Sequence, residues 1–505
     1  MSTIPLPDEP SLEQLRNRAK DLQRAVRSGD PAAVAEVAER DPRVEPLLAS
    51  PAVGSYPLSA AQLVVARRHG FRSWARLKVH VETVATYSRF PDRMAADASD
   101  DRADQFLRLA CLDYDAVGPA EWASARALLA EHPELTATSV PSAAAAGDDA
   151  ALAALLAADA AAANRPAGPY RWEPLLYVAY ARHDPAIAGV AVVAVTRRLL
   201  AAGADPNAGF LWHGLPTPFT ALTGAFGEGE RGPVEQPRHP HALVLARLLL
   251  EAGADPNDGQ ALYDRMFGPD DSHLELLFAF GLGRGDGGPW HRRLPDALDP
   301  PAVMVRGQLW WAVTHAMAAR VRLLAQHGVD LASPFDDGRT PTVVAATAGH
   351  PDIVDLLVEL GAPPPDLSPG RAFVAAALAA DRRAIDRLLA DDPGVAARVR
   401  ERRPSLVAWA ASNGSVEGVE LLVELGFDLD ARGRTDVPSD QPWQTALHAA
   451  VEAGDEPMVR ALLRLGADPN LHDERFDATP LGWAQHFGHD DLVALLEPLT
   501  VPDPG

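Results

Sequence analysis

Histidine and aromatic side chains gather between residues 170 and 315. This stretch holds five of the ten Trp residues, four of the seven Tyr residues and seven of the sixteen His residues. Imidazole groups move protons near neutral pH, whereas Trp, Tyr and Arg carry much of the energy at protein interfaces. Trp290-His291-Arg292-Arg293 joins these types in one run, in which the arginine pair could grip a carboxylate or phosphate. The stretch therefore suggests either an acid–base site or a binding surface.

No familiar catalytic motif organises these residues. The sequence has no GxGxxG after a predicted strand, no GxxxxGK[ST], no HExxH and no GxSxG, so the common nucleotide, zinc-protease and hydrolase signatures are missing. Cys111 lies in an apolar helical pattern, which predicts a buried, inert thiol. His239-Pro-His241 and His486-Gln-Phe-His489 could each offer two metal ligands. Because His489 occupies a recurring helix-start position, we favour a structural role and expect neither metal nor cofactor.

Composition and charge exclude several classes of protein. The chain has 505 residues and a net charge of −23, which argues against a duplex-binding protein because such proteins need a basic face. Its longest apolar run, around 186–195, is too short to span a bilayer. The start MSTIPLPDEP lacks the basic and apolar regions of a secretory signal. We therefore expect a cytoplasmic protein without a duplex nucleic-acid or membrane partner.

Internal repeats give the elements that must position these side chains. The runs LLAAGADPN at 199–207, LLEAGADPN at 249–257 and LLRLGADPN at 462–470 are near copies. Thr340, Ser405 and Thr445 each precede one Gly by nine residues and a second Gly by twenty-one. This spacing predicts a helix hairpin, in which the first Gly ends a short helix in left-handed geometry and the second Gly ends the next helix. One hairpin cannot cover its own apolar face, so hairpins must stack.

The hairpins resemble the ankyrin repeat. The match is best in VDLASPFDDGRTPTVVAATAGHPDIVDLLVELGA at 329–362 and TALHAAVEAGDEPMVRALLRLGADPN at 445–470. Weaker copies begin near Glu173, Thr220, Gln260, Gly307 and Ala372, and further helix pairs are expected at 105–135 and 140–160. The resemblance implies an all-α ankyrin solenoid of about ten or eleven hairpins over 105–500, with His448 making a hydrogen bond between repeats.

Residues 1–90 lie outside this register and form the helical N-terminal capping module of our prediction. The pattern predicts two helices separated at 28–31 and two more separated near Gly70. Residues 11–90 carry 13 Lys and Arg against 8 Asp and Glu. The module is similar to the helical leader ahead of some bacterial ankyrin arrays. We expect residues 91–104 to be a linker. An acidic partner, nucleic acid and the array itself are the alternative contacts of this basic leader, and docking on the acidic array is the most economical of the three.

Departures from the repeat indicate inserts near 208–219, 228–240, 282–306 and 430–443. Long loops inside a compact array are usually functional or disordered, and proteins tend to break local rules at functional places. We therefore predict that Trp212, Trp290, His291 and Trp310 line one cleft between the inserts. Ligand is expected to order residues 203–306 and to change 405–497 little.

Large aromatic residues recur four positions after a unit start, at Tyr177, Trp311, Trp409 and Trp483. By resemblance, this position faces the groove, so these rings, with Trp172, are candidate binding residues. The alternative is that they fill gaps between irregular repeats.

These observations favour a non-enzymatic scaffold that holds a protein or peptide partner, with a basic face, in its groove and inserted loops. The alternative is an enzyme or peptide-modifying protein with an improvised acid–base site in 170–315, built from Tyr177, His183, His213, His239 and His291. Convergence of these groups in a closed pocket would support the alternative. The oligomeric state is left open.

Overall fold

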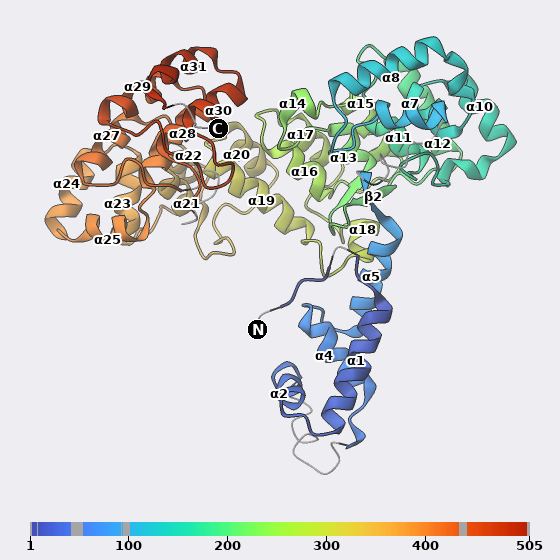
Figure 1. Cartoon of the computed structure of the whole chain (residues 1–505), viewed down its shortest axis with the longest axis horizontal. Helices are drawn as coiled ribbons and strands as arrows, with labels where there is room; N and C mark the ends of the chain where they lie inside the picture. Colours follow the sequence, from blue (N-terminus) through green and yellow to red (C-terminus); the bar gives the residue numbers. More distant parts are fainter. Residues whose placement is uncertain are drawn as a thin grey trace. The chain divides into compact units, whose positions relative to one another are not determined.

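The structure is a computed structural model that describes residues 3–7, 9–41, 54–91, 93, 101–433 and 442–501. The chain divides into two compact units, which we call the N-terminal unit (Met1–Gln308) and the C-terminal unit (Leu309–Gly505). Helices dominate both units (Figure 1).

The N-terminal unit begins with a small helical module. Its elements are α1 Leu12–Arg27, α2 Pro31–Arg40, α4 Leu58–Arg68, α5 Trp74–Tyr87 and β1 Ser88–Arg89. The breaks between helices lie where the sequence predicts them. Asp30 accepts a hydrogen bond from Ala33 N at 2.9 Å and begins α2, while Ser73 accepts one from Arg76 N at 3.3 Å and begins α5. A core of its own, which includes the fully buried Val64, holds the module together.

Helix pairs follow, as the repeat pattern predicts. The next elements are α7 Arg102–Ala110, α8 Pro119–Glu131, η3 Pro133–Ala137, α9 Val140–Ala146, α10 Asp149–Ala158, η4 Ala160–Asn164, α11 Pro174–Tyr180 and α12 Gly189–Ala201. The pairs expected at 105–135 and 140–160 are confirmed. Of the linker predicted at 91–104, residues 92 and 94–100 lie outside the described residues, and its end belongs to α7.

A small β-sheet corrects the expectation of an all-α fold. The insert predicted at 208–219 forms a hairpin of β2 Gly209–Trp212 and β3 Pro218–Thr220. Strand β1, at the end of the helical module, pairs in parallel with β2, so the sheet has three strands in the order β1-β2-β3. The hairpin exposes an edge, and unpaired main-chain groups there accept another strand. The leader thus docks on the inserted hairpin.

The rest of the N-terminal unit consists of short helices. They are α13 Ala221–Phe226, α14 Gly232–Glu235, α15 Ala242–Glu251, α16 Gly259–Met266, α17 Ser272–Ala279, α18 Gly288–Arg293 and α19 Pro301–Thr314, which ends in the C-terminal unit. The insert predicted at 282–306 is therefore partly helical, because α18 and the first turns of α19 lie in it. The insert predicted at 228–240 holds the four-residue helix α14.

Long-range polar contacts fasten the 228–240 insert. Arg182 is fully buried and donates from Nε to Pro237 O at 2.7 Å, and from Nη2 to Gly224 O at 2.6 Å. Glu228 forms an ion pair with the buried Arg265 of α16. The insert is thus ordered by buried charges rather than by repeat geometry.

The C-terminal unit continues in helix pairs (Figure 1). Its elements are α20 Ala318–Gln326, α21 Pro341–Ala348, α22 Pro351–Glu359, α23 Pro369–Leu378, α24 Arg382–Asp391, α25 Val395–Arg402, α26 Leu406–Ser412, α27 Val416–Glu424, α28 Ala446–Glu452, α29 Glu456–Leu465, α30 Pro480–Phe487, α31 Asp490–Leu496 and η5 Glu497–Leu499. One apolar core of buried residues from Ala348 to Leu496 runs through most of these helices.

Local caps set the helix ends of this unit. Gly349 follows α21 with φ of +91°, the left-handed geometry that favours glycine. Ser415 and Asp455 cap α27 and α29 through their side chains. His448 Nε2 donates to Ala478 O at 3.0 Å, which confirms the expected bond between repeats.

Candidate binding pocket in the C-terminal unit

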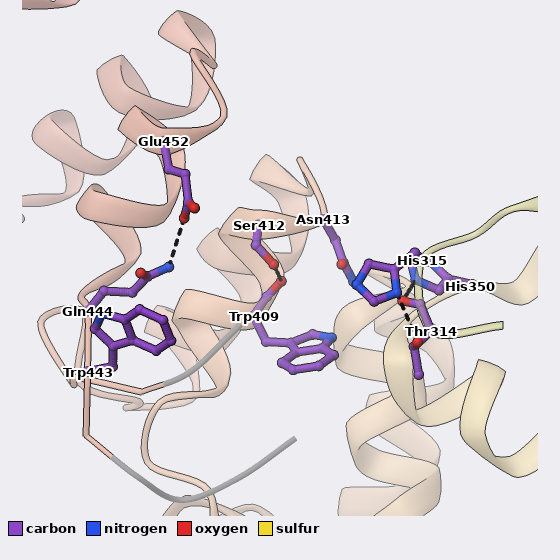
Figure 2. A pocket seen from close by; sticks show the side chains of 9 residues that line it. All are labelled: Thr314, His315, His350, Trp409, Ser412, Asn413, Trp443, Gln444 and Glu452. Atoms are coloured by element: carbon purple, nitrogen blue, oxygen red, sulfur yellow. Dashed lines mark hydrogen bonds between the residues drawn. The ribbon is translucent and has the colours of Figure 1, made fainter. Parts of the chain in front are cut away.

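A pocket of about 340 Å³ lies beside the ends of several helices of the C-terminal unit (Figure 2). It is lined by Thr314, His315, His350, Trp409, Ser412, Asn413, Trp443, Gln444 and Glu452. These residues come from the end of α19, the turn between α21 and α22, the end of α26 and both ends of α28. Ligand sites in proteins occupy volumes of this order.

The repeat register explains why these residues meet. Ser412 and Asn413 stand seven and eight positions after the unit start at Ser405, and Thr314 and His315 stand likewise after Gly307. Glu452 is seven positions after Thr445. Seven residues are about two helical turns, so this position recurs at the end of the first helix of a hairpin. Register would have indicated only part of the pocket, because His350, Trp409, Trp443 and Gln444 stand at other positions.

Helix α26 reaches across to the end of α21 at this pocket. Trp409 Nε1 donates to Ala348 O at 3.1 Å, and Asn413 Nδ2 donates to the same carbonyl at 2.6 Å. The last carbonyls of a helix lack partners within the helix, so both side chains satisfy an otherwise open acceptor. Trp409 is only 5% exposed, yet its indole forms part of the pocket wall (Figure 2).

Two histidines form another side of the pocket. His350 Nε2 donates to Thr314 O at 2.9 Å, and burial lowers the pKa of His350 below its usual value. The ring is therefore neutral at pH 7, with its lone pair on Nδ1. The His315 ring stacks on Trp311 with 3.7 Å between ring centroids, and its Nδ1 donates to Trp311 O at 2.9 Å. Both rings are held in fixed orientations.

The start and the end of α28 complete the pocket. Gln444 Nε2 donates to Glu452 Oε2 at 3.4 Å (Figure 2). The main chain of Gln444 pairs with that of Gly433. Trp443 is half-buried, and the guanidinium of Arg475 lies 5.2 Å from the centroid of its ring. Of the insert predicted at 430–443, residues 434–441 lie outside the described residues.

The four rings expected to face the groove are largely buried, which contradicts an exposed aromatic surface. Tyr177 is fully buried, Trp409 and Trp483 are about as buried as core residues, and Trp311 is half-buried. Position four points to the same helix face as position seven but one turn earlier, where neighbouring helices cover it. Trp483 Nε1 donates to Asp473 Oδ2 at 3.0 Å, so its ring is anchored to the loop that precedes α30. Trp409 lines the pocket, and a binding role for the other three stays a prediction.

Trp172 and Tyr177 belong to a buried aromatic cluster in the N-terminal unit. The Trp172 ring stacks on Phe210 of the β2 strand with centroids 4.9 Å apart. Tyr177 Oη donates to Ala167 O at 2.8 Å and accepts from Tyr170 N. Both side chains are fully buried. They fill space between a helix pair and the inserted hairpin, which is the packing alternative of the sequence analysis.

The predicted shared cleft is not formed as expected. Trp290 and His291 border a cavity of about 30 Å³ beside α18, which has room for about one water molecule. Trp290 is nearly buried and donates from Nε1 to Asn207 O at 3.0 Å. Trp212 does not border this cavity, and its Nε1 donates to Asp113 O at 3.1 Å. Trp310 belongs to the C-terminal unit, where it is half-buried.

The hydrogen bonds of the described residues do not join the candidate acid–base groups in one site. Burial lowers the pKa of His183 to about 4, and its ring packs edge-on against Phe106. His239 is buried and accepts from His241 N at 3.0 Å, while His291 bonds main-chain oxygens of its own loop. His213 Nε2 lies 3.7 Å from Asp115 Oδ2. This arrangement gives the enzyme hypothesis no support.

Cys111 is fully buried, and burial raises the pKa of its thiol, as expected for an inert side chain. Among the residues that the structure describes, no group of three or more His, Cys, Asp or Glu side chains could hold a metal ion. The described helices include none that is both long and apolar enough to cross a bilayer.

Comparison with known proteins identifies the hairpins of the C-terminal unit. Residues 372–473 match the family described as Ankyrin repeats (3 copies), and residues 337–368 match the Ankyrin repeat. Ankyrin repeats therefore occupy residues 337–473, which include Trp409, Asn413 and Glu452 of the pocket.

Several known proteins are similar over part of the chain. An L-asparaginase of Dirofilaria immitis is 29% identical over 188 residues, which are 37% of this chain and 30% of that protein. Rabankyrin-5 of Mus musculus is 28% identical over 164 residues, or 32% of this chain and 13% of that protein. Ankyrin repeat and KH domain-containing protein mask-1 of Caenorhabditis elegans is 30% identical over 177 residues, 34% of this chain and 6% of that protein. The chain thus spans less than a third of each.

Proposed function

We propose that the protein is a non-enzymatic scaffold that holds a protein or peptide partner in the groove of its C-terminal repeats. Ankyrin repeats generally mediate protein–protein interaction. The observation that carries the proposal is the pocket of about 340 Å³, which is lined in part by register positions seven and eight of the hairpins that begin at Gly307 and Ser405. Of these residues, Ser412 is exposed, whereas Thr314 is buried.

Charge favours a partner with a basic face. The C-terminal unit, residues 309–505, carries 16 arginines, no lysine and 30 acidic residues, which gives a net charge of −14. Opposite charge raises association rates and disfavours wrong partners. The basic face of the partner is thus part of the proposal.

Site-specific photo-crosslinking in cells tests this function. A benzophenone amino acid replaces Ser412 in the pocket and, as the matched control, Glu420, which is exposed on α27 and outside the pocket. We expect a discrete crosslinked protein from position 412 and much less of it from position 420. Equal crosslinking at both positions, or none at position 412, would rule the groove out as the binding surface.

A further inference from the structure

We propose that strand β2 of the inserted hairpin is a docking site for an extended segment of a partner protein, and that the leader masks this site by occupying it with β1. The site lies within the N-terminal unit, so the inference does not depend on the groove of the C-terminal repeats.

The leader keeps an apolar core that is separate from its contact with the hairpin. Buried side chains from Leu15 to Val81 form the leader's own cluster. Val84, three residues further along α5, belongs to a second cluster, which also contains Leu211, Trp290 and Leu294. Because the two clusters share no residue, the leader can leave the hairpin without exposing its own core.

The pairing that fastens the leader to the hairpin is short. Strand β1 has two residues, Ser88 and Arg89, and pairs with β2 in parallel. Parallel pairing is slightly less stable per residue than antiparallel pairing. The ion pair between Arg76 and Asp296 measures 3.8 Å, and an ion pair of this kind at the surface contributes little. The leader is therefore built to detach reversibly, as locally unfolding segments do.

Detachment exposes a strand edge that is bordered by apolar side chains. Leu211 and Leu294 are fully buried and Trp290 is nearly so, and the leader packs against them through Val84 and Tyr87. Strand β3 pairs with the other side of β2, so only the β1 side opens. Unpaired strand edges take up extended segments of other chains, with main-chain bonds for affinity and side-chain pockets for specificity.

The leader uses only part of this edge. Strand β2 runs from Gly209 to Trp212, but α5 continues to Tyr87, so β1 is extended only opposite the last two residues of β2. Within the described part of the chain, Gly209 and Phe210 have β3 as their strand partner and no partner in β1. A partner segment that is extended from its first residue could pair along the whole strand, and this advantage lets it displace the leader.

The leader itself shows which side chains the site accepts. The Tyr87 ring meets Trp290 edge-on with centroids 5.1 Å apart, and the guanidinium of Arg293 lies over the two rings at 5.1 and 4.8 Å. Two positions later, Arg89 donates from Nε and Nη2 to Arg171 O at 3.3 and 3.1 Å. A guanidinium favours an aromatic neighbour, and a carbonyl favours a donor with a fork of N–H groups. The partner segment should therefore carry an aromatic residue followed two positions later by an arginine.

Peptide titration of the full chain tests the proposal. The probe is a fluorescein-labelled peptide with the sequence of residues 84–91, VATYSRFP, and fluorescence anisotropy measures its binding. We expect the Val84→Asp chain to bind the probe about tenfold more tightly than the natural chain, because the released leader no longer occupies the site. Bound probe should also slow hydrogen exchange at 209–212 in this variant.

Val79→Asp is the matched control, because Val79 is exposed on the same helix. We expect this chain to bind the probe as weakly as the natural chain does. Tyr87→Ala removes the ring contact with Trp290 without adding a charge, so it releases the leader even if Val84→Asp disturbs the hairpin, and it should strengthen probe binding several-fold. Probes with alanine in place of the tyrosine or the arginine should bind several-fold more weakly.

The proposal is wrong if the natural and Val84→Asp chains bind the probe equally. It is also wrong if neither Val84→Asp nor Tyr87→Ala speeds exchange at 209–212, since the leader would then not detach, or if exchange speeds up and neither chain binds the probe. Sedimentation of the natural chain should show no dimer that Val84→Asp disperses. Such a dimer would make the occupant the leader of a second copy and would overturn the assignment to a partner protein.

Discussion

The two units keep their helix hairpins in place by different means. In the C-terminal unit, residues next to a helix in sequence cap it, as Ser415 and Asp455 cap the helices that follow them. In the N-terminal unit, the inserted segment is held by groups far away in sequence, such as Arg182 with Pro237 O and Glu228 with Arg265. Regular spacing lets local chemistry define a repeat, whereas insertions need long-range polar contacts in the interior.

This difference has an energetic consequence. A cap is replaced at modest cost, about 1 kcal/mol. A buried charge that loses its partners, or buried carbonyls that lose their donor, costs several times more. Substitutions at the buried polar groups should therefore damage the N-terminal unit more than cap substitutions damage the C-terminal unit.

The largest effect is expected for Arg182→Met. The Arg182 guanidinium donates to four main-chain carbonyls, those of Ala179, Ala181, Gly224 and Pro237. Met fills a similar volume but donates nothing, so the carbonyls are left buried without this donor. We expect the N-terminal unit to lose about 4 kcal/mol of unfolding free energy. Hydrogen exchange of residues 221–240 in the full chain measures this loss.

Arg197→Met is the matched control, because Arg197 is exposed on α12 of the same unit. We expect a change within about 0.5 kcal/mol there. If Arg182→Met left exchange in 221–240 as slow as before, the insert would not depend on the buried arginine, and the contrast between the units would fail.

The second-largest effect is expected for Val84→Asp, at the contact between the leader and the inserted hairpin. Val84 of α5 is buried against Leu211, Trp290 and Leu294. Val84→Asp places a carboxylate in this apolar contact, which costs about 3 kcal/mol or more. We expect the leader to separate from the hairpin, with faster exchange at 209–212 because β1 leaves β2.

Val79→Asp supplies the comparison, since Val79 lies on the same helix and is 41% exposed. It should leave exchange at 209–212 unchanged. If both variants accelerated hydrogen exchange at 209–212 equally, α5 would respond to any added charge, and the contact at Val84 would not hold the leader on the hairpin.

The sequence predicted the regular part of the fold well. Landmark glycines and capping residues act over a few positions, so their spacing gives α21, α22 and α26–α31 directly. The sheet was missed because the pairing of Ser88 with Leu211 joins residues far apart in the chain. Nothing local in either segment shows that partner.

The candidate site was predicted only in part. Trp409 was chosen as a groove residue and lines the pocket. Trp172, Tyr177 and Trp290 were chosen because large aromatics often mark binding surfaces, but large rings also fill irregular space between repeats. Residue type does not separate these two uses. Register separates them only in part, since position seven is exposed at Ser412 but buried at Thr314.

The smallest expected effect tests whether the repeat-to-repeat bonds of the C-terminal unit respond to pH. Burial lowers the pKa of His448 to about 4, and its neutral ring donates to Ala478 O. In the unfolded chain this pKa is about 6.5. Between these values the unfolded state binds more protons than the folded state, so stability rises with pH in this window. The contribution is complete above about pH 6.5 and is lost as pH falls towards 4.

His448→Gln should remove this pH dependence while keeping an amide donor at the same place. We expect the natural sequence to lose about 2 kcal/mol in residues 446–465 between pH 7 and pH 4.5 beyond the loss in the variant. Hydrogen exchange at the two pH values, corrected for intrinsic rates, measures it. His486→Gln is the control, since His486 is exposed on α30 and should leave the difference intact. The buried His183 lies in the other unit, so acid should still weaken the N-terminal unit of the His448→Gln chain. An unchanged pH dependence at 446–465 in that variant would mean that other groups set the acid response of the repeats.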